Sequence, residues 1–111
     1  MKLITWCGDS LERIREFSDE ARRESGHQLN RVQHGREPED WKPMTTVGSG
    51  VREFRIHAEG EYRVLFVAKF VESVYVLHAF AKKTRKTSKQ DLDLATVRFR
   101  AVLAERRRQG R

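Results

Sequence analysis

The chain of 111 residues is 38% hydrophobic and 35% charged, which predicts a single domain, residues 1–111, with a thin core. Lysine and arginine number 23 against 16 acidic residues, and the net charge of +7 favours phosphate-bearing or acidic partners. A lone cysteine, Cys7, excludes an intramolecular disulfide, and the chain shows no signal-peptide pattern and no apolar run of roughly 20 residues, so we expect a cytoplasmic protein without membrane contact.

The first third of the chain predicts a strand followed by two helices. Residues 2–6 alternate apolar and polar side chains, as a short strand does. Asp9 is in position to cap a first helix, and Glu12 three residues on completes a capping-box spacing. Ser18 is the expected cap of a second helix, which Gly35 ends.

After a predicted loop over residues 36–50, which holds both prolines, the hydrophobic period changes to two. Turn-forming residues at 58–60 and 71–73 divide the segment that follows into three strands. Ser88 then caps a final helix, and residues 106–111 are expected to form a frayed basic tail. The three strands are predicted over residues 51–57, 62–70 and 74–80.

This order of elements, β-α-α-β-β-β-α, predicts an α+β fold with a mainly antiparallel four-stranded sheet. We expect the two N-terminal helices and the C-terminal helix to pack on one face of that sheet. The strand at 62–70 is apolar on nearly both sides, so both of its faces should be partly covered.

A dense group of cations lies where the last strand ends and the final helix begins. Five cations and no acid occupy residues 82–89. The free N–H groups and the dipole at a helix start attract phosphate, and cations there add to the attraction. A solvated loop is the other interpretation, but such dense charge disfavours a helix start unless an anion compensates it. The cations are Lys82, Lys83, Arg85, Lys86 and Lys89.

Two further cations, Arg55 and Arg63, lie on facing strands of the predicted hairpin, near its turn. Two guanidiniums on one side of a hairpin can bind a phosphate bidentately or stabilise charge that develops on it. They can equally pair with Glu53 or Glu61, and both interpretations remain open at this point. Arg52 is a weaker candidate, since alternation turns it to the face opposite Arg55.

His78, late in the last strand, is a candidate for proton transfer near neutral pH. Alternation places it on the side of Val74, Val76 and Phe80, so a satisfied, partly buried histidine is at least an equal alternative. No metal-ligand spacing joins the histidines to Cys7, and we expect neither a metal nor a cofactor.

RNA cleavage requires neither a metal nor an enzyme nucleophile. The 2′-hydroxyl attacks the adjacent phosphate when a base takes its proton and cations stabilise the dianionic transition state. A lysine can serve as the base if crowding by other cations lowers its pKa. The cations described above are therefore compatible with a small metal-free ribonuclease.

Short motifs recur in a defined order along nearly the whole chain. They are W-C-G-D-S at 6–10, Gln33 with Gly35 and Pro38, D-W-K-P-M at 40–44, G-S-G-V-R-E-F-R at 48–55, Y-R-V at 62–64 and L-H-A-F-A-K-K-T at 77–84. In this order and spacing the chain resembles the RelE/ParE superfamily of toxins from type II toxin–antitoxin systems, most closely its phage-derived, HigB-like branch. The resemblance implies a RelE-like fold and an mRNA interferase, an endoribonuclease that usually cuts mRNA in the ribosomal A site.

The same resemblance implies partners and residue roles. The partners are mRNA, the 16S rRNA surface of the ribosome and a cognate antitoxin, expected to be a HigA-like helix-turn-helix protein. Arg63 and Lys83 are expected to stabilise the phosphate and its transition state. Proton transfer is assigned to Lys82 or His78. The substrate-binding candidates are Arg55, Arg52, Arg85 and Lys86.

The chain departs from the pattern at one point. Several cleaving relatives carry an aromatic or acidic group shortly after the last strand, whereas residues 84–90 contain neither. Two alternatives therefore stand beside the ribonuclease: a ParE-like inhibitor of DNA gyrase, and an RNA-binding module without catalysis.

Overall fold

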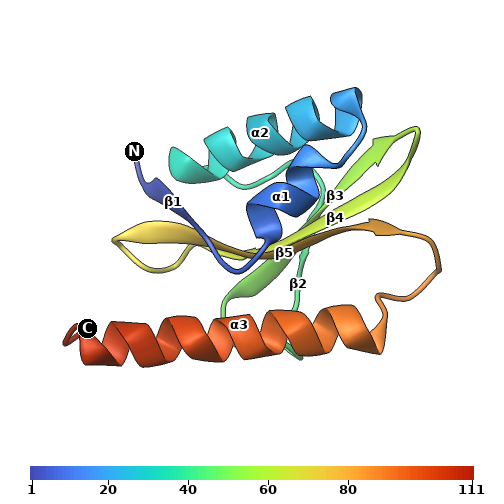
Figure 1. Ribbon diagram of the computed structural model, residues 1–111. Coiled ribbons are helices and arrows are strands. Elements are labelled where there is room, and N and C mark those ends of the chain that lie inside the picture. Colours follow the sequence, from blue (N-terminus) through green and yellow to red (C-terminus); the bar gives the residue numbers. More distant parts are fainter.

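In the computed structural model, which describes residues 1–111, three helices and five strands form one α+β unit (Figure 1). The sheet order is β1-β5-β4-β3-β2, with β1 parallel to β5 and the other neighbours antiparallel. In chain order the elements are β1 (Leu3–Trp6), α1 (Ser10–Arg15), α2 (Asp19–Gln33), β2 (Trp41–Pro43), β3 (Val51–Ala58), β4 (Gly60–Val67), β5 (Ser73–Lys82) and α3 (Lys89–Arg108).

The sheet is therefore five-stranded and mixed, and the prediction of four mainly antiparallel strands needs correction. Strand β2 lies inside the segment predicted as a loop, where Trp41 pairs with Phe54 and Pro43 with Arg52. Three residues are too few to show a period, and a proline is tolerated there because β2 is an edge strand. The parallel pairing of β1 with β5 joins segments distant in sequence, which alternation does not indicate.

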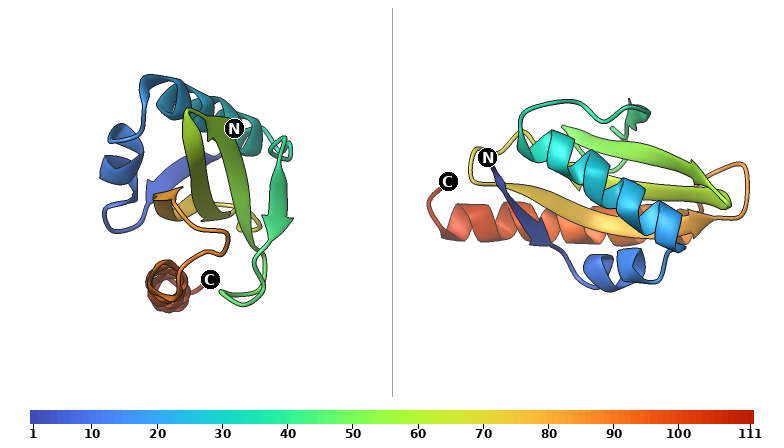
Figure 2. Two further views of the ribbon diagram at one scale, coloured as in Figure 1. Left: turned by 90° about the vertical axis from the view of Figure 1, so that its right-hand side faces the viewer. Right: turned by 90° about the horizontal axis from the view of Figure 1, so that it is seen from above.

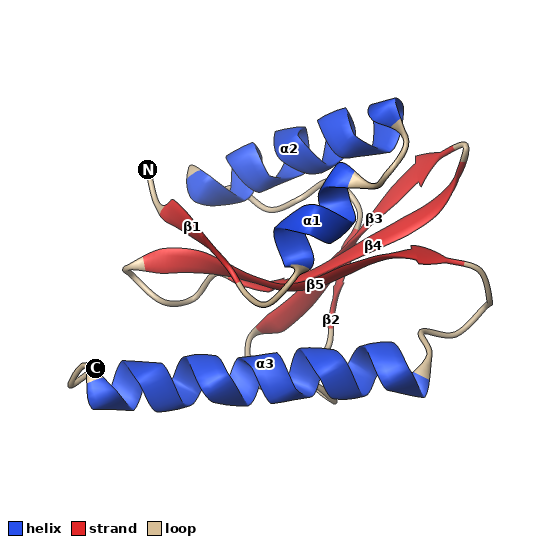
Figure 3. Cartoon of the chain, in the orientation of Figure 1, coloured by secondary structure: helices blue, strands red, loops and turns tan.

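Helices cover both faces of the sheet, so the prediction of a single helix-covered face was wrong. Helices α1 and α2 lie on one side and α3 on the other, as the end view and the secondary-structure colouring show (Figures 2 and 3). Val64 and Phe66 of β4 point into the core under α1 and α2, and Leu65 and Val67 point into the core under α3. The prediction that both faces of this strand are covered is confirmed.

Two of the three predicted helix caps are present. The Ser18 hydroxyl accepts the N–H of Ala21 at 3.2 Å, and the Ser88 hydroxyl accepts the N–H of Asp91 at 3.1 Å. Asp9 makes no side-chain cap, and its carboxylate instead accepts a hydrogen bond from Arg98 of α3 at 2.7 Å. Asp9 thus pairs with α3 instead of forming the expected capping box of α1.

Strand β5 carries an irregularity that changes the side of its residues. Leu65 pairs with His78 but Phe66 pairs with Val76, so Leu77 is an extra residue opposite this step. Val76 consequently belongs to the core under α1 and α2, whereas His78 faces α3. The expected placement of His78 on the side of Val74 and Val76 is corrected by this bulge.

The C-terminal residues 106–111, expected as a frayed tail, lie beside the turn between β4 and β5. Arg106 belongs to the last turn of α3, and its Nε donates to Glu72 at 2.6 Å. The same guanidinium stacks on Phe70 at 3.7 Å, and Arg111 also lies 3.1 Å from Glu72. This pairing holds the pKa of Glu72 at about 2.

The β3–β4 hairpin turn and the loop from β5 to α3 lie at one end of the molecule, and both termini lie at the other (Figure 1). Gly60 closes the hairpin with φ of +109°, in the region that favours glycine. The register places Arg55 directly opposite Arg63, as the sequence predicts. None of the helices combines the length and apolarity that a membrane crossing requires.

Two glycines provide a matched test of this packing. A Cβ on exposed Gly26 of α2 meets no atom within 4 Å, whereas a Cβ on Gly48 would lie 2.2 Å from the Phe99 ring in the core under α3. We expect Gly26→Ala to raise the free energy of unfolding by about 0.5–1 kcal/mol and Gly48→Ala to lower it by about 1–3 kcal/mol. Urea denaturation of both variants measures the two changes; equal stability would contradict the described packing of Phe99.

Candidate functional site

The candidate site is built around Glu53, a carboxylate with 0% exposure on the face of β3 that is turned toward α3. Its Oε1 has no hydrogen-bond partner, and its Oε2 accepts only a long hydrogen bond, 3.4 Å, from the hydroxyl of Thr87. A buried carboxylate is costly unless positive charge surrounds it. Here the surrounding charge comes from strands β2, β3, β4 and β5.

Arg63 of β4 supplies the nearest of these charges. Its Nε lies 3.5 Å from Glu53 Oε1, and its Nη1 donates to the Tyr62 carbonyl at 3.1 Å and to Glu61 at 3.4 Å. The side chain is only 7% exposed. Arg63 is therefore held between Glu53 on one side of its guanidinium and Glu61 with the Tyr62 carbonyl on the other.

Two more cations approach Glu53, one from its own strand and one from β2. Arg55 Nε lies 3.9 Å and Lys42 Nζ 4.0 Å from its Oε1. Arg55 also lies 4.0 Å from Asp40, and the backbone N–H of Arg55 donates to the Asp40 carbonyl at 2.8 Å. The ion pairs with Glu53 that the sequence left open are thus present, across the hairpin for Arg63 and within β3 for Arg55, and they bring the two arginines together.

Lys82, at the end of β5, completes this cation group. The register places it opposite Glu61, two residues beyond the pair of Phe80 with Arg63. Burial lowers the pKa of the Lys82 ammonium below its ordinary value, and the positive charge of Arg63 lowers it further. A lysine in this environment gives up its proton more readily than one in water.

One pocket joins the hairpin to the cation-rich loop. It is lined by Arg63 and Glu61 of β4, by Lys82, and by three exposed loop residues, Lys83, Thr84 and Arg85. Lys86 lies in the same loop, with its carbonyl accepting the Thr84 hydroxyl, but does not line the pocket. The structure therefore brings together most of the cations chosen from the sequence.

A hydrogen-bonded chain leads away from this pocket along the hairpin. His57 Nδ1 lies 2.7 Å from Glu61, and His57 Nε2 lies 2.6 Å from Asp40. Both ring nitrogens can donate only in the imidazolium form. Hydrogen bonds to Asp40 and Glu61 accordingly raise the pKa of His57, and the bond to His57 lowers the pKa of Glu61.

Two of the sequence candidates lie elsewhere. Arg52 points to the face opposite Arg55, as alternation predicts, and its guanidinium stacks 4.2 Å from the Trp41 ring. His78 is 1% exposed, stacks on Phe80, and its Nε2 lies 2.7 Å from Asp91. Burial lowers the pKa of His78 despite this carboxylate. A side chain so enclosed does not reach a substrate in this conformation.

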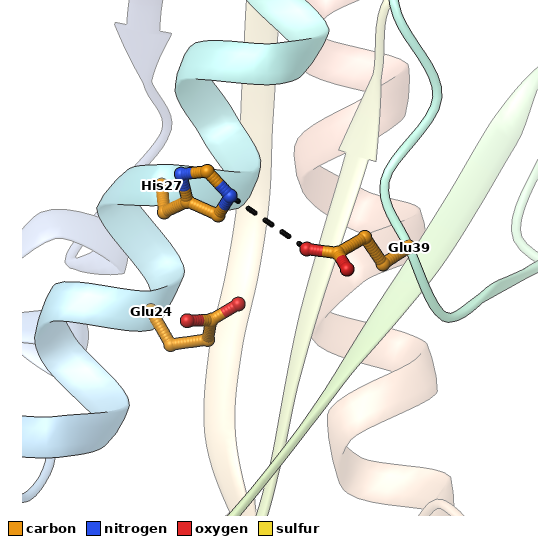
Figure 4. Close-up of side chains that lie close together, drawn as sticks. All are labelled: Glu24, His27 and Glu39. Carbon is orange, nitrogen blue, oxygen red and sulfur yellow. Dashed lines mark ion pairs between the residues drawn. The ribbon is translucent and has the colours of Figure 1, made fainter.

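One group of side chains has the composition of metal ligands. Glu24 and His27 of α2 lie near Glu39 of the following loop, with His27 Nε2 3.6 Å from Glu39 (Figure 4). The buried Gln28 donates to both carboxylates at 2.8 Å. The three groups thus have protein partners on an exposed surface, and no part of the cation pocket includes them.

Sequence reasoning missed the central role of Glu53 and the contributions of Lys42, Asp40 and Thr87. Glu53 was recognised only as one possible partner of the arginines. Charged residues are rarely buried, and no local pattern marks this one. The position of Lys42 opposite Glu53 depends on β2, which carries no detectable period.

The fold and the cation pocket define a small α+β protein with a basic, concave site at the end of its sheet. A family model, phage-derived protein Gp49-like (DUF891), matches residues 12–100. The chain therefore belongs to this Gp49-like family, a toxin-like family of toxin–antitoxin systems. No curated protein matches the chain.

Removal of the central carboxylate tests its role. Glu53→Gln keeps the shape but removes the buried counter-charge that Arg63 and the half-buried Arg55 share, so we expect the free energy of unfolding to fall by about 3–5 kcal/mol. Glu59→Gln, an exposed carboxylate without an ion pair, is the matched control and should change stability by less than about 0.5 kcal/mol. Equal stability of both variants in urea would rule out Glu53 as the organising charge.

The His57 chain predicts a pH dependence. Because the pKa of His57 is raised in the folded protein, the stabilisation is complete below the ordinary histidine pKa, near 6.5, and is lost as the pH rises through the folded value. The melting temperature should therefore exceed that of His57→Gln most at pH 6, and the difference should shrink at pH 8.5. If circular dichroism shows the same difference in melting temperature at pH 6 and at pH 8.5, the result contradicts the hydrogen bonds from both ring nitrogens of His57.

Proposed function

We propose that this protein is the toxin of a type II toxin–antitoxin pair and cleaves mRNA as a metal-independent endoribonuclease. The observation that carries the proposal is the convergence of Arg63, Lys82, Lys83 and Arg85 on one pocket from two strands and a loop. Membership in the Gp49-like family supports the toxin assignment. The resemblance to the HigB-like branch supports the choice of RNA as substrate.

The proposed reaction uses the RNA's own nucleophile. Lys82 in its neutral form accepts the proton of the 2′-hydroxyl, whose oxygen forms a bond to the adjacent phosphorus. The bond from phosphorus to the 5′-oxygen breaks, and the Lys83 ammonium donates a proton to that oxygen. The products are a 2′,3′-cyclic phosphate and a free 5′-hydroxyl.

Arg63 stabilises the dianionic transition state in this scheme. Such stabilisation is strongest when the donor is already oriented, because no reorganisation is then needed during the reaction. The contacts of Arg63 with Glu53, Glu61 and the Tyr62 carbonyl provide this orientation. Arg55 positions the substrate, and the exposed Arg85 and Lys86 bind neighbouring phosphates. His78 is left out of the proton transfer because it is buried.

The proposed partners follow from charge and from family. A net charge of +7 suits binding to mRNA and to the 16S rRNA surface near the A site. An antitoxin, proposed to be a HigA-like helix-turn-helix protein, would neutralise the toxin.

One observation favours a second candidate function. The guanidinium of Arg63 is paired with two carboxylates and its side chain is 7% exposed, which suits a structural arginine in a protein that binds RNA without cutting it. Cleavage assays separate the two functions.

The test is expression of the protein in growing cells with primer-extension mapping of transcripts. We expect codon-linked cuts, and we expect Lys82→Ala and Arg63→Ala each to reduce cleavage by about 100-fold or more, the usual loss for a proton-transfer or charge-stabilising group. Lys89→Ala is the control, since Lys89 is exposed, paired with Asp93 and outside the pocket.

Purified protein incubated with ribosomes that carry mRNA adds a readout specific to Lys82. Cleavage should increase with pH up to the lowered pKa of Lys82, because only the neutral amine accepts a proton. Intact transcripts together with retained RNA binding would reject the nuclease in favour of the binding module. Equal cleavage by the wild type and Lys82→Ala would reject Lys82 as the base.

A further inference from the structure

A second concave site lies on the other face of the sheet and does not depend on the cleavage proposed above. It is a cavity of about 340 Å³ between the end of α2, the start of β3 and the end of β4. This volume is within the roughly 300–1,000 Å³ of sites for small ligands. Four cations and one acid, Glu37, belong to its lining; the cations are Lys2, Arg36, Arg52 and Lys69.

These four cations differ from those around Glu53 in having no counter-charge. None of them lies within 4.0 Å of a carboxylate oxygen, whereas Arg63 has two such carboxylate partners. Glu37, the single acid in the lining, also forms no ion pair. The cavity therefore concentrates unneutralised positive charge from four separate segments of the chain.

Several of the cations are held in place by contacts other than ion pairs. The Arg52 guanidinium stacks 4.2 Å from the Trp41 ring, and Lys2 Nζ donates to the Ala68 carbonyl. Lys69 passes so close to Gly50 that a Cβ there would lie 2.7 Å from its side chain. Cations that are already ordered lose less conformational entropy when an anion binds.

We propose that this cavity binds the phosphate groups of a nucleotide or nucleic acid. A ligand with a single carboxylate would neutralise only one of the four cations. A phosphomonoester carries a charge of about −1.5 to −2 and offers three acceptor oxygens. Guanidiniums such as those of Arg36 and Arg52 match phosphate geometry bidentately. The apolar floor of the cavity is formed by the fully buried Phe66, so the polar groups of the lining determine the ligand.

Two sources of phosphate suit this chemistry, a strand of RNA and a free nucleotide. The experiment distinguishes them with pyrophosphate and with a short 2′-O-methyl RNA, which cannot be cleaved because its 2′-oxygen is blocked. Binding is therefore measured whether or not the protein is a nuclease. Failure of cleavage in the Arg63 pocket and failure of binding here are separate results.

The test follows backbone amide shifts by NMR while each probe is added to the full chain. We expect pyrophosphate to shift the amides of Arg36, Glu37, Gly50 and Lys69. The double variant Arg36→Gln, Lys69→Gln should weaken pyrophosphate binding by about tenfold or more, since it removes two charge-assisted contacts. For the RNA, the slope of log affinity against log salt should decrease by roughly 0.7 per cation removed.

The control is Arg107→Gln, which removes an exposed, unpaired cation from the C-terminal end of α3, outside the lining of the cavity. It should leave pyrophosphate binding unchanged, and circular dichroism checks that all variants fold. If pyrophosphate displaces the RNA from this cavity, the ligand is the strand; if pyrophosphate binds without displacing it, the ligand is a free nucleotide. Absence of shifts in the cavity, equal weakening by Arg107→Gln, or tighter binding of a polyglutamate peptide would overturn the proposal.

Discussion

The attraction between buried Glu53 and the cations around it is the constraint on which the functional end of the molecule depends. Its carboxylate has no exposure, and Arg63, Arg55 and Lys42 lie within 4.0 Å of one oxygen. Without it, two guanidiniums on neighbouring strands would repel each other across the hairpin. One acidic side chain thus allows a sheet to hold several positive charges close together while it remains folded.

The same arrangement distinguishes cations that pair within the fold from cations that are free to bind a ligand. Arg63 is oriented by its carboxylate neighbours, whereas Lys83 and Arg85 in the adjoining loop are exposed and unpaired. On the other face, the cations around Arg52 are ordered by stacking and by backbone carbonyls. The protein thus presents two basic surfaces, at opposite faces of one sheet, that differ in how their cations are fixed.

Prediction from sequence succeeds where a local pattern carries the information. Alternation over residues 51–80 predicts β3, β4 and β5, because successive side chains of a pleated strand point to opposite faces of the sheet. It also places Arg55 opposite Arg63, since the hairpin turn fixes the register. Ser18 and Ser88 predict helix starts because their hydroxyls satisfy free N–H groups.

Prediction fails where the information is tertiary. The bulge opposite Leu65 and Phe66 reverses the side of His78, and no local signal marks it. Asp9 has a capping sequence but binds Arg98, 89 residues later in the chain. The cations of the candidate site could be predicted from the sequence. Its buried carboxylate could not, because burial depends on which other parts of the chain pack on the strand.

The parallel pairing of β1 with β5 has a consequence for the order of folding. Leu3 aligns with Ser73 and Trp6 with Val76, so this contact closes a loop of most of the chain. The antiparallel ladder from β3 through β5 closes only short turns, and its entropic cost is correspondingly small. We therefore expect the antiparallel ladder of β3, β4 and β5 to form early. Strand β1 then pairs with β5 last and becomes the final edge strand of the sheet.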